Sequence, residues 1–213
     1  MNNQPGPDFV CIGAQKGGTT WLYENLARHT EVWVPPIKEF HYFDRVCIKE
    51  KWLGHWDMPH LHGIARYTSA FMPFDARRLR WLRQYYRLGM DQAWYLNLFD
   101  ERYSGGKLCG EITPGYSTLE ERGVRYARSV LDGEMKIIFI VRNPEYRAWS
   151  AAKMLLRYRG IDLASVHPGD LVDYLMSPNI TLYSQYSSIV PLWKKYFDNL
   201  HILSYDELCD SPR

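Results

Sequence analysis

The stretch that decides the fold is FVCIGAQKGGTTWL, residues 9–22. An apolar run typical of a buried strand breaks into a Lys-Gly-Gly-Thr-Thr turn, and the residues after the turn favour a helix. Two glycines allow the backbone to pass close to an anion, and the N–H groups at the start of a helix point toward it. Lys16 adds a positive charge, and Thr19 and Thr20 add hydroxyl donors. The stretch therefore predicts a phosphate-binding loop, the alternative being an ordinary glycine turn.

This loop differs from the loop that binds nucleoside triphosphates together with magnesium. In that pattern a lysine and a hydroxyl residue follow the last glycine, whereas Lys16 precedes both Gly17 and Gly18. The clearest later strand, near residues 136–141, runs into Arg142 and not into an aspartate that helps to hold Mg²⁺. An arginine side chain is planar and permanently charged, which suits a phosphate. The sequence thus predicts a multiply phosphorylated ligand held by cations, with no metal.

Strands and helices alternate along the chain. Strands are predicted at residues 8–14, 107–111, 135–141 and 201–204, and helices near 19–29, 75–88, 91–99, 118–131 and 181–198. Another helix should begin after Asn143, with Asn143 as its N-cap and Pro144 in its first position. This order predicts an α/β protein with a P-loop-type three-layer fold, in which helices flank a central, mostly parallel sheet. The ligand is expected beyond the carboxyl ends of the strands.

Composition excludes several classes of protein. The chain has 213 residues and a formal net charge of +2, so nothing in its charge suggests binding to nucleic acid. No apolar stretch approaches the ~20 residues that span a bilayer, and no signal peptide precedes the first strand, so we expect a cytoplasmic protein without a membrane span. Cys11 and Cys109 fall in strand-like runs and should be reduced core residues. The oligomeric state stays open.

Short motifs spread along the chain resemble those of one enzyme family. They are residues 15–21 (QKGGTTW), 38–44 (KEFHYFD), 93–95 (AWY), 110–116 (GEITPGY) and 140–150 (IVRNPEYRAWS). The first and the last are similar to the 5′-phosphosulfate loop and the 3′-phosphate segment of the sulfotransferases that use 3′-phosphoadenosine-5′-phosphosulfate (PAPS). The other three resemble the heparan sulfate sulfotransferase branch and its bacterial relatives. The resemblance runs from residue 8 to residue 208 and implies a single sulfotransferase domain over residues 1–213.

The resemblance also implies a reaction and a donor site. The reaction is in-line transfer of a sulfuryl group from PAPS to a hydroxyl or an amine, without a metal. Lys16 would neutralise charge on the departing adenosine bisphosphate, and Arg142 and Ser150 would bind the 3′-phosphate. The alternative for Ser150 is a small residue that lets helices pack closely. The 5′-phosphate would be held by Gly17, Gly18, Thr19, Thr20 and Trp21.

The general base is either Glu39 or His41. The resemblance places a carboxylate at Glu39, whereas the ordinary pKa of a histidine, near 6.5, suits proton abstraction at neutral pH. In a strand both side chains would lie on one face, so their spacing leaves the choice open. Each residue also has a structural alternative. Glu39 could pair with Lys38 at the surface, and His41 could simply pack among its aromatic neighbours.

The acceptor is the least determined part of the site. We expect a small molecule, a carbohydrate or a carrier-bound group, with Glu111, Trp94 and Tyr95 as substrate-binding residues. The alternative for Glu111 is an ion pair with Arg142 or Arg147. Further aromatic faces could come from Trp52, Trp56 and Trp81.

One arginine-rich helix is expected near residues 77–87. There Leu79, Leu82 and Tyr86 would form an apolar face. The adjacent stripe of arginines would be a solvated face, or a surface for an anionic acceptor or an acidic carrier; it consists of Arg80, Arg83 and Arg87.

Two departures from the family pattern qualify this interpretation. Heparan-type enzymes carry a lysine where this chain has Ile112, which favours a less charged acceptor. Residues 205–208 resemble the family's penultimate motif, after which a loop usually covers the nucleotide, so we expect the domain to lack a C-terminal segment. A catalytically impaired nucleotide-binding protein is therefore an alternative function. A kinase that uses Mg-ATP is a second, which the order Lys16-Gly17-Gly18 and Arg142 argue against.

Overall fold

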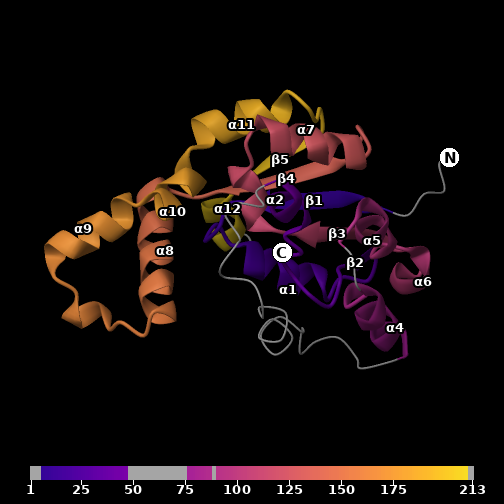
Figure 1. Ribbon diagram of the computed structural model, residues 1–213, viewed down its shortest axis with the longest axis horizontal. Helices are drawn as coiled ribbons and strands as arrows, with labels where there is room; N and C mark the ends of the chain where they lie inside the picture. Colours follow the sequence, from indigo (N-terminus) through magenta and orange to yellow (C-terminus); the bar gives the residue numbers. More distant parts are fainter. Residues whose placement is uncertain (1–5, 48–75, 88–89, 211–213) are drawn as a thin grey trace.

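The fold is known from a computed structural model that describes residues 6–47, 76–87 and 90–210. Its centre is a sheet of five strands in the order β2-β3-β1-β4-β5 (Figure 1). The strands are β1 (Phe9–Gly13), β2 (Val32–Trp33), β3 (Leu108–Ile112), β4 (Lys136–Val141) and β5 (Leu200–Ser204). Every pair of neighbours is parallel. All five residues of the central strand β1 are buried, since it has a strand on each side and helices on both faces.

Helices connect and cover these strands. The α-helices are α1 (Thr19–Leu26), α2 (Tyr42–Cys47), α4 (Ala76–Tyr85), α5 (Gln92–Asn97), α6 (Glu101–Ser104), α7 (Glu121–Val130), α8 (Pro144–Tyr158), α9 (Pro168–Met176), α10 (Pro178–Thr181), α11 (Tyr186–Lys194) and α12 (Tyr205–Asp210). Shorter 3₁₀ turns are η2 (Pro114–Thr118), η3 (Leu163–Ser165) and η4 (Leu182–Ser184). None of the helices in the described ranges has the length and apolar composition needed to cross a membrane.

The two faces of the sheet bury different clusters of side chains. Val10 and Ile12 of β1 point into the larger cluster, which also contains residues of α2, α4, α5, α7 and α11. Phe9 and Cys11 point into a smaller cluster with residues of α1 and α12. Alternate residues of a strand face opposite sides of the sheet, so β1 supplies both clusters. The three layers confirm the predicted α/β fold.

Most of the predicted helices and strands are present, and the differences occur where the sequence pattern is weak. Strand β2 was not predicted, because two half-buried residues show no periodicity. The helix expected over residues 181–198 begins only at Tyr186, after the short elements α10 and η4. The cap at Asn143 is confirmed, since its side chain accepts hydrogen bonds from the N–H groups of Glu145 and Tyr146. Cys11 and Cys109 are buried free thiols, as expected.

Only one residue of the predicted apolar face of α4, Leu82, packs against the larger core cluster. Trp81 and Tyr85 are buried, whereas Leu79 is 50% exposed and Tyr86 is 42% exposed. The rings of Trp81 and Tyr85 stack 5.2 Å apart, and both contact the ring of Phe40. Large aromatic rings bury more apolar area than the leucine, so they decide which face packs inward. The predicted arginine stripe is exposed to solvent, with Arg80 and Arg83 in α4 and Arg87 just after its end.

Candidate active site

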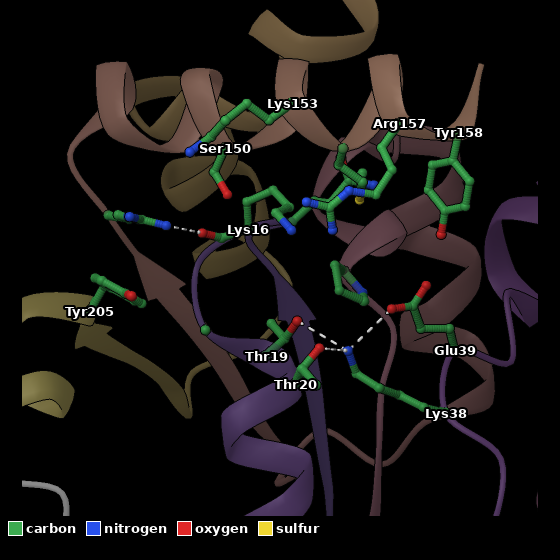
Figure 2. A pocket seen from close by; sticks show the side chains of 15 residues that line it. Lys16, Thr19, Thr20, Lys38, Glu39, Ser150, Lys153, Arg157, Tyr158 and Tyr205 are labelled. Atoms are coloured by element: carbon green, nitrogen blue, oxygen red, sulfur yellow. Dashed lines mark hydrogen bonds and ion pairs between the residues drawn. The ribbon is translucent and has the colours of Figure 1, made fainter. Parts of the chain in front are cut away.

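A pocket of about 680 Å³ lies at the carboxyl ends of β1 and β4, where the chain turns into α1 (Figure 2). This is the edge of the sheet at which parallel α/β proteins bind ligands. Helices α1, α8 and α12, the turn η2 and three loops contribute to the pocket. The lining residues are Gln15, Lys16, Gly18, Thr19, Thr20, Lys38, Glu39, Pro114, Arg142, Ser150, Lys153, Met154, Arg157, Tyr158 and Tyr205.

The loop between β1 and α1 needs its two glycines for different reasons. A Cβ atom at Gly17 would lie 2.9 Å from the backbone oxygens of both Ala14 and Ile140, so only glycine fits there. Gly18 has φ 96°, a left-handed conformation that side chains disfavour, and it precedes the first turn of α1. The backbone therefore passes tightly over the end of the sheet and enters the helix at the pocket wall.

Positive charge dominates the pocket. Lys16, Lys38, Arg142, Lys153 and Arg157 all line it, whereas Glu39 is the only carboxylate among the described lining residues. Burial lowers the pKa of Lys16, and the charges of the four other cations lower it further. Cations that raise each other's energy in this way favour the binding of a multiply charged anion.

Lys38 is a site residue that the sequence analysis treated only as a partner of Glu39. Its buried ammonium group donates hydrogen bonds to the hydroxyls of Thr19 and Thr20, at 3.2 and 3.3 Å. It also contacts Oε1 of Glu39 at 3.1 Å. Lys38 thus joins the start of α1 to the loop that carries Glu39. Its position beside Glu39 in the 38–44 motif was the available signal.

Glu39 and His41 lie in a loop, so the expected strand alternation is wrong for this segment. Both residues have left-handed backbones, with φ 64° and 54°, and α2 begins directly after them. Their side chains nevertheless meet, with Nε2 of His41 3.5 Å from Oε2 of Glu39. Nδ1 of His41 lies 2.7 Å from Oδ2 of Asp44. The imidazole ring therefore lies between two carboxylates.

Each of these contacts shifts the proton affinity of the pair. Burial alone would raise the pKa of Glu39, but the hydrogen bond to His41 and the charges of Lys38 and His41 lower it to about 2. Burial alone would lower the pKa of His41, but Asp44 and Glu39 raise it to about 9. At neutral pH His41 is therefore an imidazolium ion and Glu39 a carboxylate. Glu39 lines the pocket, whereas His41 is not among its lining residues.

The same shifts predict how stability depends on pH. The contribution of His41 is complete below its ordinary pKa of 6.5 and is lost as the pH rises through about 9. The contribution of Glu39 is complete above its ordinary pKa of 4.5 and is lost as the pH falls toward about 2. We expect His41→Gln to lower Tm by about 5 °C between pH 4.5 and pH 6.5, where both contributions are complete. At pH 9 and above the decrease in Tm should be much smaller.

Thermal unfolding at a series of pH values measures this difference. His201→Gln, which removes an exposed histidine of β5, is the matched control and should leave Tm unchanged. A His41→Gln effect that stays constant from pH 5 to pH 10 would contradict the paired charge of His41.

Arg142 lies at the end of β4 and contacts two other parts of the pocket. Its Nη1 donates a hydrogen bond of 3.0 Å to the backbone oxygen of Lys16. Its guanidinium carbon lies 4.2 Å from the centre of the Tyr205 ring, a residue that the sequence analysis did not place in the site. Ser150 faces the same pocket from α8, about two helical turns after the end of β4. The guanidinium group of Arg142 and the hydroxyl of Ser150, both suited to a phosphate, thus border the same cavity as the Lys16 loop.

This arrangement agrees with a match to a known family. A family model described as the sulfotransferase domain matches residues 6–213. The chain belongs to the sulfotransferase family. The predicted resemblance to sulfotransferases is confirmed, and its assignment to the heparan sulfate branch stays a prediction.

Solved structures of bacterial sulfotransferases share the fold. The sulfotransferase from Alicyclobacillus acidocaldarius has a TM-score of 0.63 and is 22% identical, over 97% of this chain and 76% of that one. The sulfotransferase domain of the Synechococcus PCC 7002 olefin synthase has a TM-score of 0.59 and is 17% identical, over 99% of this chain and 70% of that one. The sulfotransferase domain of the curacin biosynthetic pathway has a TM-score of 0.57 and is 15% identical, over 98% of this chain and 70% of that one.

The substrate-binding residues expected from the sequence of this sulfotransferase lie elsewhere. Trp94 is 5% exposed, Tyr95 is fully buried and Glu111 is 2% exposed, and none of them lines the pocket. Aromatic residues serve cores as well as binding sites, and these rings pack in the larger core cluster. Glu111 contacts hydroxyl groups in place of the expected arginines, as described below. Trp52 and Trp56 lie outside the described residues.

Three other residues named in the sequence analysis lie away from the pocket. Trp21 packs against the smaller core cluster and is not among the pocket-lining residues. Trp81 is buried in the larger cluster. Ile112 is 1% exposed and packs in the smaller cluster, so this side chain does not reach the pocket. Within the described ranges, no group of three His, Cys, Asp or Glu side chains is placed to hold a metal ion.

Proposed function

We propose that this sulfotransferase transfers a sulfuryl group from PAPS to a hydroxyl or an amine, with Glu39 as the general base. The observation that carries the proposal is the pocket itself, in which five cations and a phosphate-type loop surround one ionised carboxylate. PAPS has two anionic ends, the 3′-phosphate and the 5′-phosphosulfate. The pocket offers separate cationic groups for each end, and the chemistry of its donors therefore fits this molecule.

The donor would be held along the floor and one wall of the pocket. The N–H groups at the start of α1, with the hydroxyls of Thr19 and Thr20, suit the 5′-phosphate. Arg142 and Ser150 suit the 3′-phosphate, which distinguishes PAPS from ATP. When bound, PAPS supplies the sulfuryl group and leaves as 3′,5′-adenosine bisphosphate.

The residues of this chain have distinct tasks in that reaction. Lys16 neutralises the negative charge that grows on the leaving phosphate oxygen, and Lys38 holds Thr19, Thr20 and Glu39 in one arrangement. Glu39 accepts the proton that the acceptor hydroxyl loses as its oxygen bonds to sulfur. A carboxylate of low pKa can do this because the proton becomes strongly acidic once that bond begins to form. His41 keeps Glu39 ionised and oriented.

The acceptor would enter beside Glu39. In Figure 2, Arg157 and Tyr158 of α8 lie toward Glu39, and Tyr205 lies at the opposite end of the pocket. A guanidinium group on the acceptor side favours an acceptor that carries a negative charge near its hydroxyl. Small molecules, carbohydrates and carrier-bound groups can all meet this description.

Binding measurements test the donor site. We expect 3′,5′-adenosine bisphosphate to bind without metal and more tightly than ATP with Mg²⁺, as measured by isothermal titration calorimetry. Arg142→Ala should weaken bisphosphate binding by about 10- to 100-fold, since it removes a charged hydrogen-bond donor. It should change the affinity for adenosine 5′-monophosphate, which has no 3′-phosphate, by less than about threefold.

The controls separate the 3′-phosphate contact from general damage to the protein. Arg102→Ala removes an exposed arginine that pairs with Asp100, outside the pocket, and should change neither affinity. Preference for Mg-ATP would overturn the PAPS assignment in favour of a kinase. Equal weakening of both nucleotides by Arg142→Ala would contradict the proposed 3′-phosphate contact.

A further inference from the structure

Glu111 is a buried carboxylate that the proposed reaction does not use. It lies near the end of β3, 2% exposed, and accepts hydrogen bonds from three hydroxyl groups. The donors are Tyr95 at 2.6 Å, Thr113 at 2.7 Å and Tyr116 at 3.1 Å. Burial raises the pKa of Glu111 to about 7, although the three hydroxyls act to lower it. A buried carboxyl group with three donors is costly to assemble, which calls for an explanation of its place here.

Two of these hydroxyls also hold the backbone of the Glu39–His41 loop. Oγ1 of Thr113 accepts a 3.0 Å hydrogen bond from the N–H of Phe40. The hydroxyl of Tyr116 accepts one of 3.0 Å from the N–H of Tyr42. The N–H of Glu39 donates to the backbone oxygen of Ile112 at 3.2 Å. Three N–H groups within residues 39–42 thus form hydrogen bonds with the end of β3 and the turn after it.

The loop needs such support because of its backbone. Glu39 and His41 both have left-handed conformations, which residues other than glycine avoid and which persist only where the surroundings impose them. A hydroxyl group has one proton to donate. When Glu111 is ionised it can only accept, so the hydroxyls of Thr113 and Tyr116 then give their protons to Glu111 and turn their lone pairs toward the loop. The ionised form of Glu111 therefore determines the direction of both hydrogen-bonded chains.

We propose that Glu111 is a positioning residue that acts through Thr113 and Tyr116 to hold the loop in the conformation that brings His41 between Glu39 and Asp44. Its importance for catalysis rests on the proposed function, whereas its effect on the loop can be measured without donor or acceptor. The proposal also gives Glu111 a role other than substrate binding or an ion pair with an arginine.

The pKa of the His41 imidazole depends on the contacts of its ring with Asp44 and Glu39, so it reports the conformation of the loop. It is about 9 because Asp44 and Glu39 both contact the ring, and it should move toward 6.5 when the loop shifts. Histidine side-chain ¹⁵N–¹H spectra recorded from pH 5 to pH 10 give this pKa, with His41→Gln used to assign the signal. We expect Thr113→Val and Tyr116→Phe each to lower it by about one unit.

Tyr95→Phe is the matched control. It removes an equally buried hydroxyl that donates to the same carboxylate, but this hydroxyl makes no hydrogen bond to the loop backbone. The phenylalanine keeps the ring stacking on Tyr42, whose centroid lies 4.6 Å away. We expect the His41 pKa to change by less than roughly 0.3 unit in this variant. Thr113→Ser, which keeps the hydroxyl, should preserve the wild-type value.

Two further results would complete the test. Glu111→Gln keeps the shape of the side chain but replaces one acceptor oxygen with a donor, and it should lower the His41 pKa as Thr113→Val does. Equal decreases in Tyr95→Phe and Thr113→Val would mean that loss of any bond in the core loosens the loop, which would overturn the proposal. An unchanged His41 pKa in folded Thr113→Val, Tyr116→Phe and Glu111→Gln would overturn it as well.

Discussion

Glu39→Gln should reduce kcat by about 1,000-fold, within the range typical for loss of a general base. Glutamine has nearly the same shape as glutamate, and its amide oxygen can still accept the hydrogen bond from Lys38. It cannot take up the acceptor's proton at neutral pH. The rate of 3′,5′-adenosine bisphosphate release from PAPS, with an acceptor found by screening, measures the loss.

The controls for this variant distinguish a chemical role from a structural one. The affinity for adenosine bisphosphate, measured by calorimetry, should stay within about threefold of wild type because the cations that bind it are unchanged. Glu121→Gln removes a 53% exposed carboxylate that pairs with Lys195, and it should leave kcat unchanged. Unaltered kcat in Glu39→Gln would contradict the assignment of the base. If no acceptor is turned over by the wild type, the chain would be a nucleotide-binding protein without turnover.

The pH profile of kcat separates Glu39 from His41. With Glu39 as the base, the protonation of the base itself should not change kcat from pH 5 to pH 8, since burial is outweighed by His41 and Lys38 and the pKa of Glu39 is about 2. With His41 as the base, kcat should rise with pH up to about 9, where the imidazolium ion loses its proton. A steadily rising limb would therefore transfer the role to His41.

Lys16→Met should lower kcat by about 100- to 1,000-fold, which is the range for removing one group that stabilises charge in a transition state. The methionine keeps most of the apolar length of the side chain and removes the ammonium group. The charge that develops on the leaving phosphate oxygen then has no cation beside it from the loop. Bisphosphate affinity should fall by less, about tenfold, because Lys38 and Arg142 still line the pocket.

Lys136→Met provides the comparison for Lys16→Met. Lys136 is an exposed lysine at the start of β4, at the opposite end of that strand from Arg142, and it should affect neither kcat nor affinity. A loss of affinity with kcat unchanged in Lys16→Met would contradict a role in the transition state, since it would show that Lys16 only binds the nucleotide.

Local patterns in the sequence were enough for the side of the pocket formed by the Lys16 loop and Arg142. The strand, glycine turn and helix at residues 9–22 are contiguous, so one stretch specifies both the loop and its place at the sheet edge. Arg142 follows β4, and its position at the same edge follows from parallel pairing of β1 with β4. The cap at Asn143 depends only on its neighbours in the sequence. Such features need no knowledge of what packs against them.

The side of the pocket formed by Lys38 and Glu39 depended on tertiary contacts. The side chains of Glu39, His41 and Asp44 meet because two residues adopt left-handed backbones, which no hydrophobic period encodes. Lys38 reaches Thr19 and Thr20 only after α1 and this loop have packed together.

Burial decided the remaining roles. Composition alone could not separate the core rings of Trp94 and Tyr95 from rings that would bind an acceptor, since both kinds are apolar and planar. Glu111 lies one residue from the end of β3, where a polar side chain suggests a binding site, but helices and the turn after β3 cover it. The sequence by itself therefore determined the phosphate-type loop, the parallel sheet and the family. Only tertiary packing decided which polar side chains face the pocket and which, like Glu111 of β3, are buried behind it. The reason is that burial depends on elements far apart in the chain.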